Sequence, residues 1–208
     1  TVGAFTEKAF IRDESYFGWR PVAPSGDLCP TSRTSVQWPL DWPIKPDIVL
    51  EGGNYAENGP ERSAVDDLSL LTTTLPSGLE HGRLLTTTGD TSPATASAAR
   101  MAAIIWSHYP RLRPETVRAL LVHSARWTSK MLERYPGSQK SVVRERLRCY
   151  GYGVPLLRRA LWSAENAATL LFEGDLSPYR RTDSRVQSNV MHVHRLPWPT
   201  AVLEDLAE

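Results

Sequence analysis

The sequence is poor in cysteine: its 208 residues include only two, Cys29 and Cys149. These lie far apart and outside any spacing typical of metal ligands, which argues against a disulfide scaffold and against a zinc site. Neither sign of charge dominates, because 24 Lys and Arg residues oppose 23 Asp and Glu residues and the formal net charge is +1. The chain therefore has no overall field that would draw it to nucleic acid or to an anionic membrane.

Long apolar runs are also missing, since no stretch approaches the roughly 20 residues of a membrane-spanning helix. The N-terminus lacks the charged-then-apolar layout of a signal peptide. We therefore expect no nucleic-acid partner and no membrane partner, and the unpaired cysteines favour a reducing compartment, the cytoplasm. What remains, 41% hydrophobic and 23% charged residues, is the composition of a globular protein with a sizeable core.

Several stretches have the composition of strands. Residues 46–53 (PDIVLEGG) form a short apolar run ended by two glycines, which is typical of a buried strand that opens into a tight turn. Residues 68–74 and 83–89 are rich in β-branched side chains and are predicted to form two strands joined as a hairpin or paired loop.

Helices are predicted in the second half of the chain. After Pro93 the pattern is alanine-rich and apolar nearly all round, which predicts a buried helix that neighbouring backbone can approach closely. Pro114 and Pro155 stand at helix-start positions, and each is followed by apolar residues at helical spacing. The coarse prediction is therefore an α/β protein.

Ser92 stands at the boundary between the threonine-rich stretch and the alanine-rich helix. A serine followed by proline is a common N-cap and first helical residue, and this role needs no chemistry. The alternative is a nucleophile, because the amide groups and positive dipole of a helix N-terminus would stabilise an oxyanion formed beside it. The local pattern alone leaves both interpretations open.

Residues 90–96 (DTSPATA) resemble the nucleophile motif of the subtilisin-like serine peptidases, G-T-S-x-A-x-P. Thr91, Ser92 and Ala94 match that motif and Gly89 precedes it, whereas Asp90 stands at the family glycine and Ala96 at the family proline. Residues 45–53 (KPDIVLEGG) resemble the upstream K-P-D-[IV]-x-A-P-G segment, with Leu50 and Glu51 at its alanine and proline.

Further segments resemble the family in the same order along the chain. Residues 1–4 (TVGA) are similar to V-x-V-G-A, and residues 32–35 (SRTS) stand where many members have F-S-S-x-G. Residues 108–125 resemble the helix that follows the serine helix, and residues 150–155 (YGYGVP) are similar to G-x-G-x-[ILV]. The resemblance covers about residues 1–168. This ordered set is more specific than any single motif and favours the nucleophile interpretation, which is compatible with a capping role.

The resemblance implies a fold and a domain division. We expect part of a subtilisin-like α/β fold, with a mostly parallel sheet flanked by helices. Residues 1–174 would form the C-terminal part of the catalytic domain, and residues 175–208 a short mixed extension of unknown role.

The resemblance also implies a serine endopeptidase that acts on a polypeptide. Ser92 would be the catalytic nucleophile and its backbone N–H an oxyanion donor, with Gly89, Asp90, Thr91 and Ala94 as motif neighbours. In this family the order along the chain is Asp, His, Ser, so the acid, the base and the oxyanion asparagine would precede Thr1. We therefore expect a fragment that is inactive alone and has the missing N-terminal part of the domain as its partner.

The other candidate catalytic and metal-binding residues have weaker support in the sequence. His81 lies in a turn-like stretch that matches no catalytic position of the family, and His192 with His194 lacks a third metal ligand at a convincing spacing. No metal and no cofactor are predicted from these residues, although the family fold allows calcium in the full-length protein. The alternative function is a non-catalytic subtilase-like module that binds peptides or partner domains, and Asp90 at the family glycine is its support.

Overall fold

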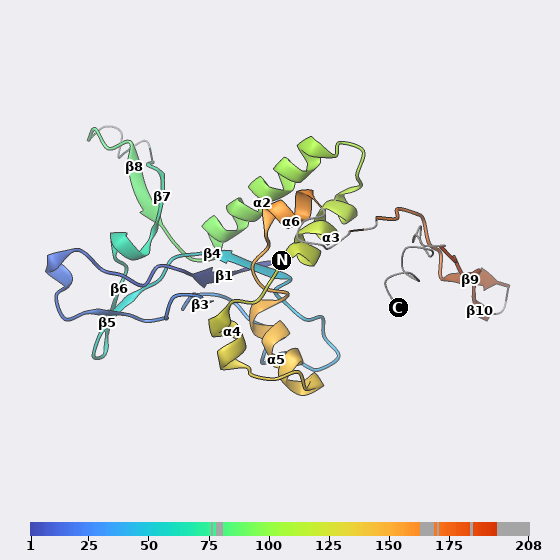
Figure 1. The fold of residues 1–208 in the computed structure, drawn as a ribbon, viewed down its shortest axis with the longest axis horizontal. Helices are drawn as coiled ribbons and strands as arrows, with labels where there is room; N and C mark the ends of the chain where they lie inside the picture. Colours follow the sequence, from blue (N-terminus) through green and yellow to red (C-terminus); the bar gives the residue numbers. More distant parts are fainter. Residues whose placement is uncertain (76, 78–80, 163–168, 170, 184, 195–208) are drawn as a thin grey trace, which may run out of the picture. The chain divides into compact units, whose positions relative to one another are not determined.

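The computed structural model describes residues 1–75, 77, 81–162, 169, 171–183 and 185–194. The chain divides into two compact units, Thr1–Thr169 and Leu170–Glu208, and each is described by itself. Figure 1 shows the helices and strands of both units.

The first unit contains eight strands among its described residues: β1 (Val2–Thr6), β2 (Arg20–Pro21), β3 (Asp27–Leu28), β4 (Ile48–Glu51), β5 (Ala56–Asn58), β6 (Glu61–Ser63), β7 (Leu70–Thr73) and β8 (Leu85–Thr88). Its described helices are α2 (Thr91–His108), α3 (Pro114–Ser124), α4 (Ser129–Arg134), α5 (Lys140–Tyr150) and α6 (Leu157–Leu161). Two short 3-10 helices lie at Glu14–Tyr16 and Asp66–Leu68.

A small mixed sheet lies at the centre of this unit, with strand order β3-β1-β4. β1 runs parallel to β4, with Val2 opposite Ile48 and Ala4 opposite Leu50, and antiparallel to β3. β4 lies within residues 46–53, where the sequence predicted a buried strand. The α/β class is confirmed, but a mostly parallel sheet is not, because every other named strand pair of the described residues is antiparallel.

The physical reason is the length of the connections. A parallel pair needs a long crossover between its strands, and residues 7–47 provide one between β1 and β4. The pairs β5–β6 and β7–β8 are instead formed by strands that follow one another in the chain, so they fold back as antiparallel hairpins.

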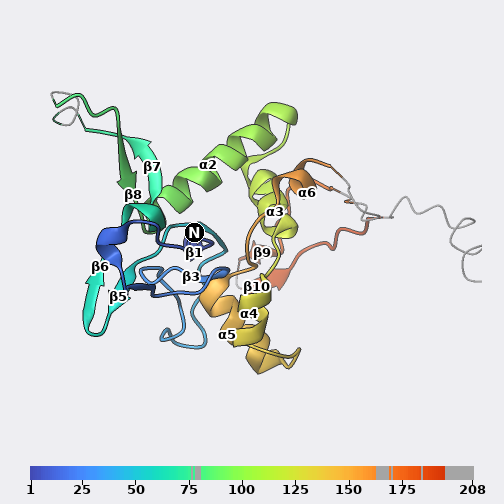
Figure 2. The same ribbon diagram turned by 60° about the vertical axis from the view of Figure 1, so that its left-hand side comes forward.

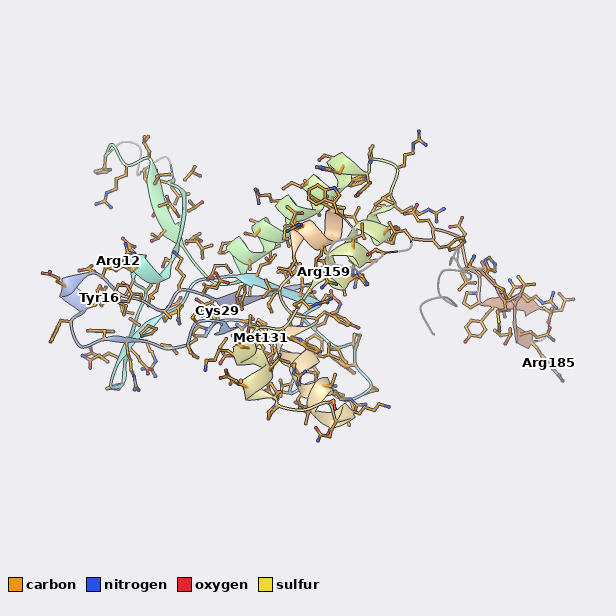
Figure 3. All side chains as sticks on the ribbon, viewed as in Figure 1. Arg12, Tyr16, Cys29, Met131, Arg159 and Arg185 are labelled. Carbon is orange, nitrogen blue, oxygen red and sulfur yellow. The ribbon has the colours of Figure 1, made fainter. Side chains whose placement is uncertain are left out.

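Side chains alternate between the two faces of the central sheet, as the pleat of a strand requires. Ala4, Ile48 and Leu50 pack with buried residues of α2, α3 and α6. Phe5 and Val49 face the other way and pack with Met131 of α4 and with Cys149 and Tyr150 of α5. Figures 1 and 2 show these two groups of helices on opposite sides of the sheet, and Met131 is labelled in Figure 3.

The predicted hairpin of threonine-rich strands is confirmed. β7 and β8 pair antiparallel, with Leu70 opposite Thr88, and β8 leads directly toward α2. A separate three-stranded sheet, in the order β2-β5-β6, packs over its own small core of Ala56, Val65 and Leu68.

Helix α2 differs from its prediction in two respects. It begins at Thr91, two residues before Pro93, and Asp90 rather than Ser92 occupies the N-cap position. One face is buried through Ala94, Ala98, Met101 and Ile105, while alanines on the other side, such as Ala96 and Ala103, are exposed. The prediction of a helix buried all round is therefore wrong for the described residues.

The other helices match the sequence unevenly. α3 starts at Pro114 as predicted, whereas α4 and α5 had not been predicted. The helix predicted after Pro155 is described as α6 up to Leu161, and its continuation at residues 163–168 lies outside the described residues.

Helix α5 holds the loop at residues 35–39 through the buried guanidinium of Arg148. Its Nη1 donates to the carbonyl oxygens of Ser35 and Trp38 at 2.8 and 2.7 Å, and Nη2 donates to that of Pro39 at 3.1 Å. A charged group is normally costly to bury, and here three main-chain carbonyls compensate part of that cost. The loop is therefore fixed by a side chain that lies far away in the sequence.

The second unit contains an antiparallel hairpin of β9 (Tyr179–Thr182) and β10 (Arg185–Ser188), and all eight residues are exposed. Residues 195–208 of the predicted extension lie outside the described residues, and the predicted boundary after residue 174 stays a prediction. Among the described residues, no helix is long and apolar enough to cross a membrane.

Candidate active site

The turn that leads from β8 into α2 has an unusual backbone. Asp90, the N-cap residue, has φ 71° and ψ −152°, and it is the one non-glycine residue with positive φ among those the structure describes. Glycine adopts this region without a steric penalty, whereas other residues incur one of about 1–3 kcal/mol. The position thus has the conformation for which glycine is suited, in agreement with the glycine of the motif that residues 90–96 resemble.

The main chain of Asp90 is held against the end of β4. Its N–H donates to the carbonyl oxygen of Gly52 at 2.8 Å, and the N–H of Gly52 donates to the carbonyl oxygen of Phe5 at 2.9 Å. A Cβ atom at Gly52 would lie 2.4 Å from the carbonyl oxygen of Asp90 and 2.5 Å from the Cβ of Ala4. This close approach needs glycine at position 52 and fixes the start of α2 against both strands.

The carboxylate of Asp90 does not cap α2. No side-chain capping hydrogen bond is formed at this N-terminus. Instead, Oδ1 accepts a hydrogen bond from Thr31 Oγ1 at 2.5 Å and lies 3.5 Å from the hydroxyl of Tyr55. Partial burial and the negative charge of Asp90 raise the pKa of the Tyr55 phenol above its ordinary value. Asp90 therefore joins α2 to two other segments of the unit.

Ser92 is exposed and is the second residue of α2. Because the first amides of a helix lack intrahelical acceptors, the N-terminal end of α2 presents N–H groups and the positive end of the helix dipole. Ala94, two residues further along the helix, is fully buried in the core cluster that includes Ala4, Ile48 and Leu50 of the sheet and fixes the helix there. An exposed hydroxyl beside free amide groups is the arrangement that a nucleophile and an oxyanion site require.

The other predicted neighbours lie in the same turn. Gly89 and Thr91 are both half-buried, and a Cβ at Gly89 would make only an ordinary contact, 3.5 Å from the carbonyl oxygen of Gly52. Glu51, at the family proline, accepts hydrogen bonds from the backbone N–H groups of Gly53 at 2.7 Å and Glu7 at 2.6 Å. Its carboxylate is therefore used by the main chain.

No base is placed on Ser92 by the part of the chain that the structure describes. The Nδ1 atom of His81 contacts the carbonyl oxygen of Ser77 at 2.9 Å. His108 ends α2, sixteen residues after Ser92 and therefore about 24 Å away along the helix, and its Nδ1 contacts the carbonyl oxygen of Ile104. His192 and His194 belong to the second unit.

The acidic residues of the hairpin region are occupied by other contacts. Asp66 Oδ1 accepts from Thr87 Oγ1 at 2.8 Å, and Asp67 Oδ2 accepts from the backbone N–H groups of Arg12 and Asp13. Across the described residues, no group of three or more His, Cys, Asp or Glu side chains is arranged to hold a metal ion.

Two residues of the site were missed by reasoning from the sequence. Thr31 and Tyr55 lie 59 and 35 positions before Asp90, and neither falls in a recognisable motif. Cys29, labelled in Figure 3, lies beside them: its Sγ is 3.3 Å from Thr31 Oγ1 and 3.8 Å from the carbonyl oxygen of Gly52. Only the folded chain brings these side chains to the start of α2.

Comparison with known proteins adds one match. The family model described as the subtilase family, Peptidase_S8, matches residues 1–153, which include the central sheet, the turn at Asp90 and all of α2. A search of curated proteins finds no match to this chain.

Proposed function

Because the chain belongs to the subtilase family of serine peptidases, we propose that Ser92 is the nucleophile of an endopeptidase. The Ser92 hydroxyl attacks the carbonyl carbon of a peptide bond in a polypeptide substrate and forms an acyl-enzyme, which water then hydrolyses. The observation that carries the proposal is the position of Ser92: it is exposed, two residues after a strained N-cap and at the amino end of a helix anchored in the core.

The N-terminal amides of α2 supply the electrostatic part of this mechanism. The backbone N–H of Ser92 donates to the oxygen that becomes negatively charged in the tetrahedral intermediate, and the helix dipole favours the same charge. The Ser92 hydroxyl proton must pass to a base, which we assign to a histidine outside these 208 residues. We assign the second oxyanion donor, an asparagine side chain, to the same region outside these residues. The rest of the peptide-binding cleft is assigned there as well.

A fluorophosphonate probe tests the nucleophile directly, because it modifies a serine only when a base activates that serine. The full-length natural protein is expected to be labelled at Ser92. Ser92→Ala is expected to abolish labelling and to lower kcat by about a millionfold, the scale measured for nucleophile loss in subtilisin. Ser97→Ala, on the same helix, is the matched control and should be labelled normally.

The isolated 208-residue chain separates the serine from its proposed base. We expect it to fold but to hydrolyse peptides poorly or not at all. Robust hydrolysis by this chain, lost in Ser92→Ala, would show that the base lies within these residues and would refute that part of the proposal.

One observation favours a second candidate function, a non-catalytic module that binds peptides or partner domains. Asp90 puts a carboxylate where the family motif has glycine, two residues from the proposed nucleophile. If the full-length protein bound peptides but was neither labelled nor active, this second function would hold and the first would fail.

A further inference from the structure

The N-terminus of α2 offers its N-cap residue a single capping donor. A capping side chain accepts a hydrogen bond from the N–H of the second or third helical residue. In α2 the second residue is Ser92 and the third is Pro93, which has no N–H. The only amide that an aspartate at position 90 can cap is therefore the one that the proposed function assigns to the oxyanion.

Aspartate is among the strongest N-cap residues, so its carboxylate competes for that amide. If Asp90 accepted the Ser92 N–H, it would occupy the donor and place a negative charge beside the oxygen that becomes negative during the reaction. Both effects oppose transition-state stabilisation. A glycine at position 90 would create no such conflict, since it has no side chain.

The structure shows the carboxylate turned away from this amide. Thr31 Oγ1 donates to Asp90 Oδ1 at 2.5 Å, and the Tyr55 hydroxyl lies 3.5 Å from the same oxygen. Thr31 has one hydroxyl hydrogen, which the carboxylate takes. Cys29 Sγ lies 3.3 Å from Thr31 Oγ1 and donates to the carbonyl oxygen of Gly52 at 3.8 Å. Burial raises the pKa of the Cys29 thiol above its ordinary value.

We propose that Thr31, supported by Tyr55, is a positioning residue that holds the Asp90 carboxylate off the Ser92 amide and so keeps this N–H free for the carbonyl oxygen of the substrate. This inference rests on the proposed function of Ser92. It assigns a role to a residue that lies outside every motif of the sequence and explains how a carboxylate is accommodated at this position.

Thr31→Val in the full-length natural protein tests the proposal, because valine keeps the shape of threonine without its hydroxyl. We expect kcat to fall by at least about tenfold, toward the 10²–10³-fold loss typical of a missing oxyanion donor, with KM little changed. Thr31→Ser restores the hydroxyl and should restore kcat. Thr87→Val is the matched control. It removes a β8 hydroxyl that donates to Asp66, and it should leave kcat unchanged.

The decisive comparison repeats Thr31→Val in an Asp90→Gly background. Without the carboxylate, loss of the Thr31 hydroxyl should have no effect on kcat. If Thr31→Val lowers kcat by the same factor with and without Asp90, the role of Thr31 is structural and the proposal is wrong. If Thr31→Val does not fold, Tyr55→Phe replaces it in the same pair of backgrounds. Its loss of kcat should be smaller than that expected for Thr31→Val and should occur only when Asp90 is present.

A structural measurement separates this proposal from the proposed function. In Thr31→Val the amide proton of Ser92 should shift downfield in the NMR spectrum, as expected when a carboxylate accepts it, and should not shift in the Asp90→Gly background. An unlabelled and inactive natural protein would overturn the proposed function, whereas an unmoved amide signal in folded Thr31→Val would overturn the role of Thr31.

Discussion

The backbones of Gly52 and Asp90 lie so close together that each restricts which residue fits at the other position. The carbonyl oxygen of Gly52 accepts the N–H of Asp90, and the space on the other side of Gly52 is filled by the carbonyl of Asp90 and by Ala4. The position of the proposed nucleophile therefore depends on a residue that makes no contact with substrate in the proposed mechanism.

Gly52→Ala is expected to be strongly destabilising, because its Cβ would overlap backbone atoms that cannot rotate away. Overpacking of this kind costs about 1–3 kcal/mol or more in the free energy of unfolding, measurable by urea denaturation. Gly89→Ala is the matched control: its Cβ would lie 3.5 Å from the nearest atom, the carbonyl oxygen of Gly52. Equal stability of the two variants would contradict the close approach at Gly52.

The sequence offered candidate site residues only where these are contiguous. Thr91, Ser92 and Ala94 are candidates because they form a motif, and the conformation of Asp90 fits the glycine that the motif has there. Thr31 and Tyr55 could not be found, since a hydroxyl that bonds a distant carboxylate leaves no periodic or spacing signal. The capping role expected of Ser92 was wrong because the helix starts at Thr91, with a proline at its third position.

At the level of elements, α5 depends on one charged side chain to hold the loop at residues 35–39. Arg148 is buried, and its guanidinium donates to several carbonyl oxygens of that loop. Neither partner was expected from the sequence, because a loop carbonyl carries no residue-specific signal and α5 was not predicted.

Arg148→Met should therefore destabilise the protein by about 1–3 kcal/mol, since the carbonyl oxygens of Ser35, Trp38 and Pro39 would lose their donor. Urea denaturation measures this loss. Arg144→Met, on the same helix but only half-buried, is the control and should change the free energy of unfolding by less than about 1 kcal/mol. A similar effect of both substitutions would mean that helix propensity, not the loop contact, determines the change.

Helix α2 shows the limit of composition as a guide to burial. Its alanines predicted a helix correctly, because alanine has the highest helix propensity. They did not predict which face is buried, since alanine is small enough to fit either environment. The buried face is set by Met101 and Ile105, which pack with the central sheet and with α3 and α6.

On the scale of the whole molecule, several buried or partly buried thiols and phenols have a raised pKa in the folded protein. Burial raises the pKa of the thiols of Cys29 and Cys149 and of the phenols of Tyr135 and Tyr150, that of Tyr135 to about 12. The unfolded chain loses these protons near the ordinary values of about 8.5 for cysteine and about 10 for tyrosine. The folded state thus binds more protons than the unfolded state at alkaline pH.

The free energy of unfolding should therefore fall as the pH rises. The stabilisation is complete below about pH 8 and is lost above it, by at most about 1.4 kcal/mol per pH unit for each group. Urea midpoints at about pH 8 and about pH 10.5 measure the effect. Tyr150→Phe should reduce the slope, whereas Tyr152→Phe, at an exposed position, should not. A midpoint that is constant over this range would contradict the prediction.

The hydrogen bond between Tyr150 and Asp27 spans 123 positions of the chain, and this distance has a consequence during synthesis. A ribosome adds about 5–20 residues per second, so the strand that carries Asp27 exists for roughly 6–25 s before α5 is complete. From the time β4 is made until α5 is complete, the sheet face formed by Phe5 and Val49, which α4 and α5 cover in the folded protein, has no partner. The nascent chain therefore offers a chaperone an apolar surface on the order of ten seconds before the domain can close.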